Sequence, residues 1–254
     1  ADRTFDMAKV DILKLLDIDL ITLKAIIKEY KDGTLGVPKD PILEALNEAM
    51  TVSLTGLEGG HVIDEGNVEK AWTVNANSLT WDDSLKAFDF GKNKGNSIYT
   101  ENYNPGIDFT VDFDVYIDGA PGANWSFLFV IANASGGQPG FGLGINSTNT
   151  WNPAVDGSGS ATYTESSFVG RWIHITATKS STEGVVIYQD NSSVYTKAEG
   201  THSVAQYNRF VVGNNAALAK SFDGKIANFK VFNKVVSEEE RTYLYNHGKT
   251  APSA

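Results

Sequence analysis

Residues 109–118 read Phe-Thr-Val-Asp-Phe-Asp-Val-Tyr-Ile-Asp, and every odd-numbered residue of the stretch is apolar. Successive side chains of a β-strand point to opposite faces of a sheet, so this alternation predicts a strand with one face in a core. The almost wholly apolar stretch from Ser126 to Ile131 favours a central strand. Five other stretches have a strand-like composition: 141–146, 172–179, 184–189, 209–212 and 225–232.

Clusters of Gly, Pro, Asp and Ser separate these stretches, as at 118–122, 136–140 and 156–159. Such clusters favour tight turns. Many short strands joined by turns predict a mainly β fold, a two-sheet antiparallel jelly-roll sandwich spanning residues 51–248.

Two helical patterns precede the sandwich, in a segment that we place at residues 1–50. Residues 6–31 carry apolar side chains at the 3-4 spacing of a coiled-coil seam. Asp40 and Pro41 then favour the start of a short helix that reaches about Met50. The seam residues are Leu13, Leu16, Leu20, Leu23, Ile27 and Tyr30.

The apolar stripe of this segment is too wide for an isolated helix, so it must be buried against something. Three alternatives remain: a helical cap on the sandwich, self-association, or anchoring to a larger assembly through residues 6–50. At the other end, Ser237 and Glu240 form a capping-box pattern that predicts a short helix up to about Asn246. Residues 249–254 are expected to be a frayed tail.

The composition excludes some classes of binding partner and some kinds of chemistry. The formal net charge is −10 and the pI is about 4.8, which disfavours nucleic acid and anionic membrane surfaces as partners. The absence of Cys excludes disulfides and thiolate chemistry. The start at Ala1 fits either a removed signal peptide or a cleaved initiator Met.

Three segments together resemble the laminin-G-like jelly roll of the concanavalin A-like lectin/glucanase superfamily. The first runs from Leu85-Lys86-Ala87-Phe88-Asp89-Phe90-Gly91 through Gly95-Asn96-Ser97-Ile98-Tyr99 into Asp108. The second is Gly170-Arg171-Trp172-Ile173-His174-Ile175 with Val185-Val186-Ile187-Tyr188. The third is Phe222-Asp223-Gly224-Lys225-Ile226 and onward to the C-terminal helix. The resemblance implies a jelly roll, and the superfamily includes lectins, adhesion domains, glycanases and modules on virus particles.

Glycanases of this fold need two accessible carboxylates on one strand. Their usual Glu-x-Asp-x-x-Glu run is missing, and the nearest pair is Asp112 and Asp114. This pair fits three interpretations: a solvated polar face, a site for a cation or sugar hydroxyls, or a catalytic dyad. His174, which follows Trp172 on a predicted strand, is expected to pack within the sheet. We therefore expect no enzyme.

Sugar sites on sandwiches combine exposed aromatic rings with carboxylates and amides. The sugar-binding candidates are Trp125, Trp151, Tyr163, Tyr116, Asp112 and Asp114. Calcium prefers oxygen ligands, and the metal candidates are Asp64, Glu65, Asn67 and Asp223. For Trp125 and Trp151, edge packing is an alternative, as ordinary solvated turns are for the acidic residues.

The sequence thus predicts a non-catalytic recognition or display module on a helical foot, located on a virion surface or outside a cell. Its expected partners are a glycan or cell-surface polysaccharide, or copies of itself. The alternatives are a secreted lectin-like protein and a glycanase that uses Asp112 and Asp114.

Overall fold

The computed structural model divides the chain into two compact units, Ala1–Pro41 and Ile42–Ala254. The six predicted seam residues and the tail from 250 lie outside the described residues, so the foot and its role remain predictions. The described residues are 40–75, 78–91, 95–119, 125–133, 140–146, 150–155, 158–159, 163–164, 169–198 and 207–249.

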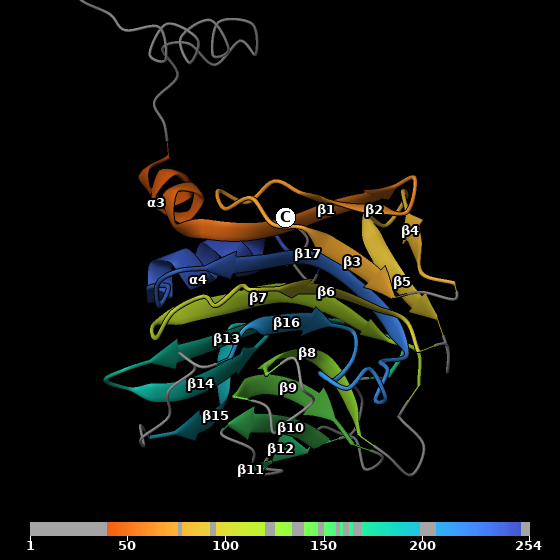
Figure 1. Ribbon diagram of the computed structural model, residues 1–254. Coiled ribbons are helices and arrows are strands. Elements are labelled where there is room, and N and C mark those ends of the chain that lie inside the picture. Colours follow the sequence, from red (N-terminus) through yellow and green to blue (C-terminus); the bar gives the residue numbers. More distant parts are fainter. Residues whose placement is uncertain are drawn as a thin grey trace, which may run out of the picture. The chain divides into compact units, whose positions relative to one another are not determined.

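The second unit is a sandwich of two antiparallel sheets, as predicted (Figure 1). In the described part of the chain, the first sheet has nine strands in the order β15-β14-β13-β7-β17-β1-β2, with β5 paired to β17 and β4 to β5. Its strands are β1 (Met50–Glu58), β2 (His61–Asp64), β4 (Thr80–Asp82), β5 (Ala87–Gly91), β7 (Phe109–Ile117), β13 (Trp172–Ser180), β14 (Gly184–Gln189), β15 (Ser192–Lys197) and β17 (Gly224–Phe232).

The second sheet has eight described strands in the order β11-β10-β9-β8-β16-β6-β3, and β12 pairs with β10. Its strands are β3 (Trp72–Asn75), β6 (Ser97–Glu101), β8 (Ser126–Ala132), β9 (Phe141–Ile145), β10 (Thr150–Val155), β11 (Ser158–Gly159), β12 (Tyr163–Thr164) and β16 (Arg209–Val212).

Aromatic rings from both sheets meet in the core. The Phe129 ring of β8 lies 5.8 Å from Phe113 of β7 and 6.4 Å from Phe229 of β17, centroid to centroid. It also lies 5.6 Å from Phe141 and 6.1 Å from Phe210 of its own sheet. All five side chains are buried. Burial of large aromatic surface is the main stabilising contribution that joins the two sheets.

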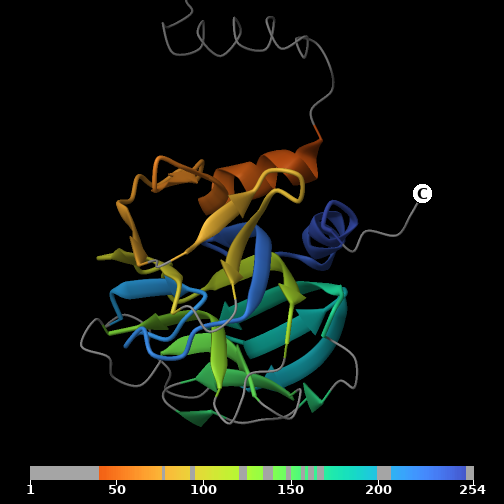
Figure 2. The same ribbon diagram turned by 90° about the vertical axis from the view of Figure 1, so that its right-hand side faces the viewer.

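Two helices pack against β17 of the first sheet (Figures 1 and 2). Helix α3 (Pro41–Ala49) begins at the predicted proline, and its Leu46 packs in one apolar cluster with Phe232 of β17 and Leu244 of α4 (Glu238–Asn246). The predicted second helix therefore belongs to the β unit, and the unit boundary follows Pro41. No helix in the described ranges is long and apolar enough to cross a membrane.

Helix α4 begins with the predicted capping box. Ser237 Oγ accepts a hydrogen bond from the Glu240 amide at 3.2 Å, and Glu240 Oε2 accepts one from the Ser237 amide at 2.9 Å. Its next turn contacts the β14–β15 hairpin, where the Arg241 guanidinium lies 3.9 Å from the Tyr188 ring centroid and donates to Asn191 Oδ1 at 2.7 Å. These contacts fix α4 on the outer face of the first sheet.

A glycine ends β16 where the chain reverses next to the core. Gly213 has φ +79°, and a Cβ there would lie 2.1 Å from the Phe90 ring. Gly106 has a comparable positive φ of +103°, but a Cβ there would meet nothing within 4 Å. An alanine at Gly106 would therefore introduce backbone strain alone, whereas an alanine at Gly213 would also overlap the Phe90 ring.

We expect Gly106→Ala to lower the free energy of unfolding by about 1–3 kcal/mol, from backbone strain alone. Gly213→Ala should cost about 1–3 kcal/mol more, because the methyl group overlaps Phe90. Urea unfolding measures both variants. Equal losses would contradict the close packing of Gly213 against Phe90.

Candidate functional site

Two carboxylates and an imidazole meet on the outer face of the first sheet. In the β7–β13 register, Asp114 lies opposite His174 and Asp112 lies opposite Thr176. Asp114 Oδ1 lies 2.9 Å from His174 Nδ1, and Asp112 Oδ2 lies 3.2 Å from His174 Nε2. The alternation that directs Phe113 into the core directs both Asp residues to this opposite face. We call Asp112, Asp114 and His174 the carboxylate–histidine cluster.

Neutral side chains hydrogen-bond to the same two carboxylates. Thr176 Oγ1 donates to Asp112 Oδ2 at 2.7 Å. Asn228 Nδ2 donates to Asp114 Oδ2 at 2.6 Å, from the point where β17 shifts register against β7. Side chains of β13 and β17 thus bond to the two carboxylates within one sheet.

The C-terminal end of α4 covers the cluster. The Tyr245 ring contacts the His174 ring edge-on with centroids 5.6 Å apart. A Cβ on Gly248 would lie 2.8 Å from Asp114 Oδ1 and 2.9 Å from His174 Nδ1, so a larger residue fits there only if the cluster shifts. As a result, Asp112, Asp114 and His174 are at most 1% exposed.

This burial corrects the interpretations of Asp112 and Asp114. The solvated polar face is wrong, because water does not reach either carboxylate. Nor does the pair line the open groove that a glycanase dyad or a sugar-hydroxyl site requires. The partner of the pair is the His174 side chain, whose predicted place within the sheet is confirmed.

The two carboxylates keep His174 charged. Burial alone lowers the pKa of the imidazole, but the charge and hydrogen bond of Asp112 and those of Asp114 outweigh it and raise the pKa to about 10. The cluster therefore contains a buried imidazolium between two acceptors at neutral pH.

The metal candidate Asp64 is fully engaged with protein donors. Its Oδ1 accepts from the Ser53 amide at 2.8 Å and from the Gly66 amide at 2.9 Å. Its Oδ2 accepts from Trp72 Nε1 at 2.8 Å and lies 3.4 Å from Lys70 Nζ. A calcium ion would have to displace the Lys70 ammonium group and the hydrogen bond from the Trp72 indole.

The other metal candidates serve separate purposes. Asn67 Nδ2 donates to the carbonyl oxygens of Asn47 and Glu48, which stabilises the C-terminal end of α3. The carbonyl oxygen of Asp223 accepts from the Asp118 amide, and the side chain of Glu65 is exposed. In the part of the chain that the structure describes, no three His, Asp or Glu side chains are grouped to hold a metal ion. The described residues thus do not group the acidic calcium candidates into a metal site, and calcium binding there stays a hypothesis.

The aromatic candidates differ in accessibility. Trp125, just before β8, is 42% exposed, as a sugar-stacking residue must be. Trp151 is 1% exposed and its Nε1 donates to Gln189 Oε1 at 2.6 Å, so its ring is packed, as the alternative interpretation had it, and does not stack on a sugar. Tyr116 is half-buried against Trp172, with ring centroids 5.7 Å apart. Tyr163 pairs with Trp151 through its backbone in β12, and its side chain lies outside the described residues.

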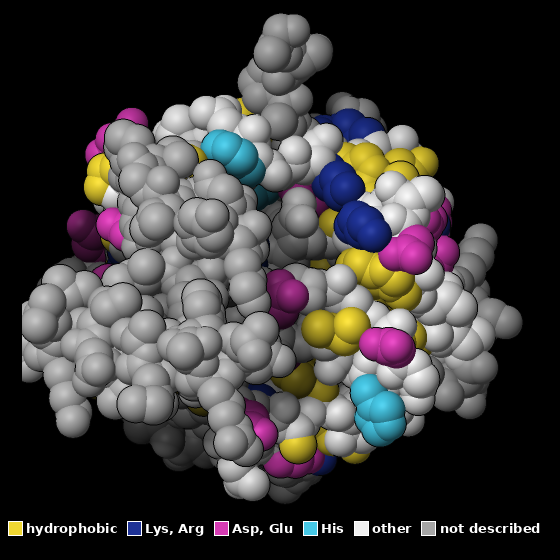
Figure 3. All heavy atoms as spheres, turned by 90° about the horizontal axis from the view of Figure 1, so that it is seen from above, with side chains coloured by type: hydrophobic (Ala, Val, Ile, Leu, Met, Phe, Trp, Pro, Cys, Tyr) yellow, Lys and Arg dark blue, Asp and Glu magenta, His cyan; other side chains and the backbone are white. Residues whose placement is uncertain are grey.

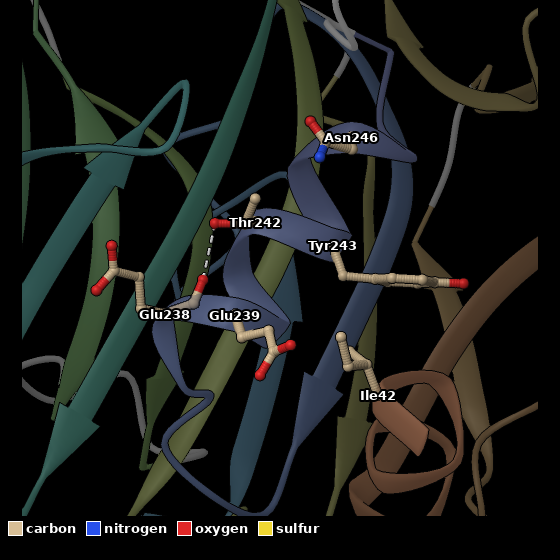
Figure 4. Close-up of a pocket in the computed structure, with 6 residues that line it drawn as sticks. All are labelled: Ile42, Glu238, Glu239, Thr242, Tyr243 and Asn246. Atoms are coloured by element: carbon tan, nitrogen blue, oxygen red, sulfur yellow. Dashed lines mark hydrogen bonds between the residues drawn. The ribbon is translucent and has the colours of Figure 1, made fainter. Parts of the chain in front are cut away.

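An open pocket of about 530 Å³ lies between α3 and α4 (Figure 4). Sequence reasoning missed it, because Ile42 and α4 are almost 200 residues apart in the chain. The lining residues are Ile42, Glu238, Glu239, Thr242, Tyr243 and Asn246. On the face seen in Figure 3, the described acidic and basic side chains are interspersed with hydrophobic ones.

The family is decided by a sequence match. The profile described as the concanavalin A-like lectin/glucanases superfamily, laminin G type, matches residues 90–240, more than half of the chain. The chain belongs to this superfamily. No curated protein matches the sequence.

Solved structures share the superfamily jelly roll at low sequence identity. The binding domain of botulinum neurotoxin serotype D is 17% identical with a TM-score of 0.63, covering 80% of this chain and 52% of that one. A Trypanosoma rangeli sialidase with the inhibitor DANA is 18% identical with a TM-score of 0.63, covering 89% of this chain and 38% of that one. The chain thus spans about half the length of the neurotoxin domain, and the likeness concerns the fold.

In the described part of the chain, one buried side-chain amide of β10 in the second sheet has no hydrogen-bond partner. Asn152 is 1% exposed, and neither its Oδ1 nor its Nδ2 makes a hydrogen bond. By contrast, the buried Asn214 accepts from the Asn215 and Lys220 amides at 2.9 and 2.7 Å. An unsatisfied buried amide is destabilising, whereas a bonded one holds its loop.

We expect the free energy of unfolding to fall as the pH rises from about 6.5 to about 10. The raised pKa of His174 means that its stabilisation is complete below its ordinary pKa of 6.5 and is lost through about 10. Urea unfolding across this range should show the decrease, and His174→Gln should remove most of it. A wild-type slope unchanged in His174→Gln would contradict the buried imidazolium.

We expect Asn152→Leu to raise the free energy of unfolding by about 1–3 kcal/mol, because it removes an unsatisfied amide at similar volume. The matched control Asn214→Leu should lower it, because two backbone amides lose their acceptor. Thermal unfolding ranks the two. A destabilised Asn152→Leu would mean that the amide is partnered.

Proposed function

We propose that this chain is a non-catalytic carbohydrate-recognition module that acts at a cell or particle surface. Membership in a superfamily named for lectins and glucanases supports the ligand class. One neighbour of similar fold is described by the dependence of botulinum neurotoxin type C cell entry on two ganglioside molecules, at 12% identity and a TM-score of 0.61. Another is a sialidase with a bound inhibitor.

The observation that carries the non-catalytic assignment is the carboxylate–histidine cluster. Glycoside hydrolysis needs a proton donor and a second carboxylate on either side of an accessible glycosidic bond. Asp112 and Asp114 are instead buried, bonded to a charged imidazole and covered by Gly248 and Tyr245. They contribute to stability, and recognition is left to surface groups such as Trp125.

A second function is favoured by the seam pattern of residues 13–30. A self-associating foot would display several sandwiches on a virion or another extracellular scaffold, and several weak glycan contacts would then act together. This role rests on the sequence pattern alone. Light scattering of the purified chain tests it, and a monomer at micromolar concentration would contradict it.

We expect a glycan screen of the full chain to give binding that survives a calcium chelator, because Asp64 is already bonded to Lys70 and three protein N–H groups. If Trp125 stacks on the sugar, Trp125→Ala should weaken binding by about 0.5–1.5 kcal/mol, whereas Trp72→Phe should not weaken it. Binding that vanishes with chelator would restore a calcium site. A blank in both conditions would contradict the sugar function.

A further inference from the structure

A row of side chains crosses the outer face of the first sheet, with one residue on each of five neighbouring strands. Residues directly opposite one another in antiparallel strands point to the same face of a sheet. The register pairs Trp172 of β13 with Tyr116 of β7, Tyr116 with Lys225 of β17, Lys225 with Asp89 of β5, and Asp89 with Thr80 of β4. We call these residues the outer-face row. At the usual spacing of strands the row extends about 19 Å, which suits an extended ligand.

The outer-face row is accessible, whereas the carboxylate–histidine cluster two residues further along β7 and β13 is covered by α4. Thr80 is exposed, and the other members of the row are partly exposed. The side chains of Lys225 and Asp89 are 20% and 30% exposed. A molecule in solution can therefore reach the row but not the cluster.

Two aromatic rings form one half of the row. The Tyr116 and Trp172 rings contact each other edge-on, with centroids 5.7 Å apart and an interplanar angle of 61°. The hydrophobic clusters of the described residues include Trp72, Trp81 and Trp151, but neither ring of this pair. The pair thus presents aromatic surface on the solvent side of the sheet, where it does not contribute to the core.

Polar pairs lie on both sides of the rings. Lys225 Nζ lies 3.0 Å from Asp89 Oδ2 and 4.0 Å from Asp118 Oδ2. On the β14 side, Arg171 Nη1 lies 3.2 Å from Asp190 Oδ2. Ion pairs this exposed contribute little to stability. A sugar hydroxyl both donates and accepts, so it can bond to the cation and the carboxylate of one pair at the same time.

This arrangement favours a neutral sugar over other occupants. Two cations and three carboxylates beside the rings give no net positive charge, which disfavours a polyanion. Strands β7, β13 and β17 each have a strand on both sides, so a peptide cannot add to the sheet here by backbone hydrogen bonds. A stable contact with a second copy would need a larger apolar surface than two rings.

We propose that the outer-face row binds a neutral oligosaccharide laid across the strands. The C–H face of one sugar lies against Trp172 and Tyr116, and the hydroxyl groups of the next sugar bond to Lys225 and Asp89. The inference rests on the proposed function, and it names the binding surface and the class of glycan.

The test is isothermal titration of the full chain with cellohexaose, mannohexaose, xylohexaose and the hexamer of galacturonic acid at equal ionic strength. We expect at least one neutral hexamer to bind. The acidic hexamer should bind about ten-fold more weakly or not at all, because it brings carboxylates to Asp89 and Asp118.

Two pairs of variants locate the site. Lys225→Met should weaken binding of the neutral hexamer about ten-fold, because hydrogen bonds to the ammonium group are lost. The control Lys86→Met removes the ammonium group of another exposed ion pair, outside the row, and should have no effect. Trp172→Ala should weaken binding about three- to ten-fold, and Trp125→Ala should not. Urea unfolding shows that each variant is folded.

The outcomes separate the two proposals. Neutral hexamers that bind equally well to both row variants, or that lose affinity only in Trp125→Ala, overturn the inference and leave the proposed function. Equal losses in Lys225→Met and Lys86→Met overturn the row, because they would reflect only the net charge. Equally tight binding of the acidic hexamer overturns the ligand class. A blank with all four hexamers overturns the inference, and the glycan screen then decides the proposed function separately.

Discussion

The buried contact of His174 with Asp112 and Asp114 determines how the rest of this molecule is arranged. It joins β7 to β13 on the face away from the aromatic core, and Asn228 extends it to β17. Separation of such a group from its partners would leave an uncompensated charge out of water, at a cost of about 3–5 kcal/mol. The C-terminal turn of α4 must therefore stay over the cluster, and only glycine fits at the closest point of approach.

The position of α4 also determines where the pocket beside α3 forms. Because its last turn is held at the cluster and Arg241 is held at the β14–β15 hairpin, its first turn is placed beside α3. The pocket at Ile42 and Tyr243 is thus formed by the same contacts that bury the carboxylates. The fold buries two acidic residues, Asp112 and Asp114, and leaves two others, Glu238 and Glu239, exposed in the first turn of α4.

Local patterns in the sequence predicted the elements well. The alternation at 109–118, the apolar stretch at 126–131 and the capping box at Ser237 reflect short-range physics, and all three elements are present. Burial of the polar face of β7 could not be predicted in this way, because its cover is provided by Gly248, more than 130 residues later. The same holds for Asp64, whose donors Ser53 and Trp72 come from two other strands.

The burial of the aromatic candidates could not be predicted from local sequence patterns either. Trp125 and Trp151 have similar neighbours in the sequence, yet one is 42% exposed and the other is bonded to Gln189 in the core. The face of a strand that points inward is set by register, and a shift of one residue reverses it. The exposure of a residue whose neighbours come from distant parts of the chain could therefore be determined only from the structure.

The most direct test of this account is nitrogen NMR of the His174 ring in the intact protein at pH 8. The account predicts that both ring nitrogens are protonated, with the chemical shifts of an imidazolium and no titration until the pH approaches about 10. A neutral ring that titrates near pH 6.5 would contradict it. Asp112 and Asp114 would then lack their cation, and the case against a catalytic pair would rest on their burial alone.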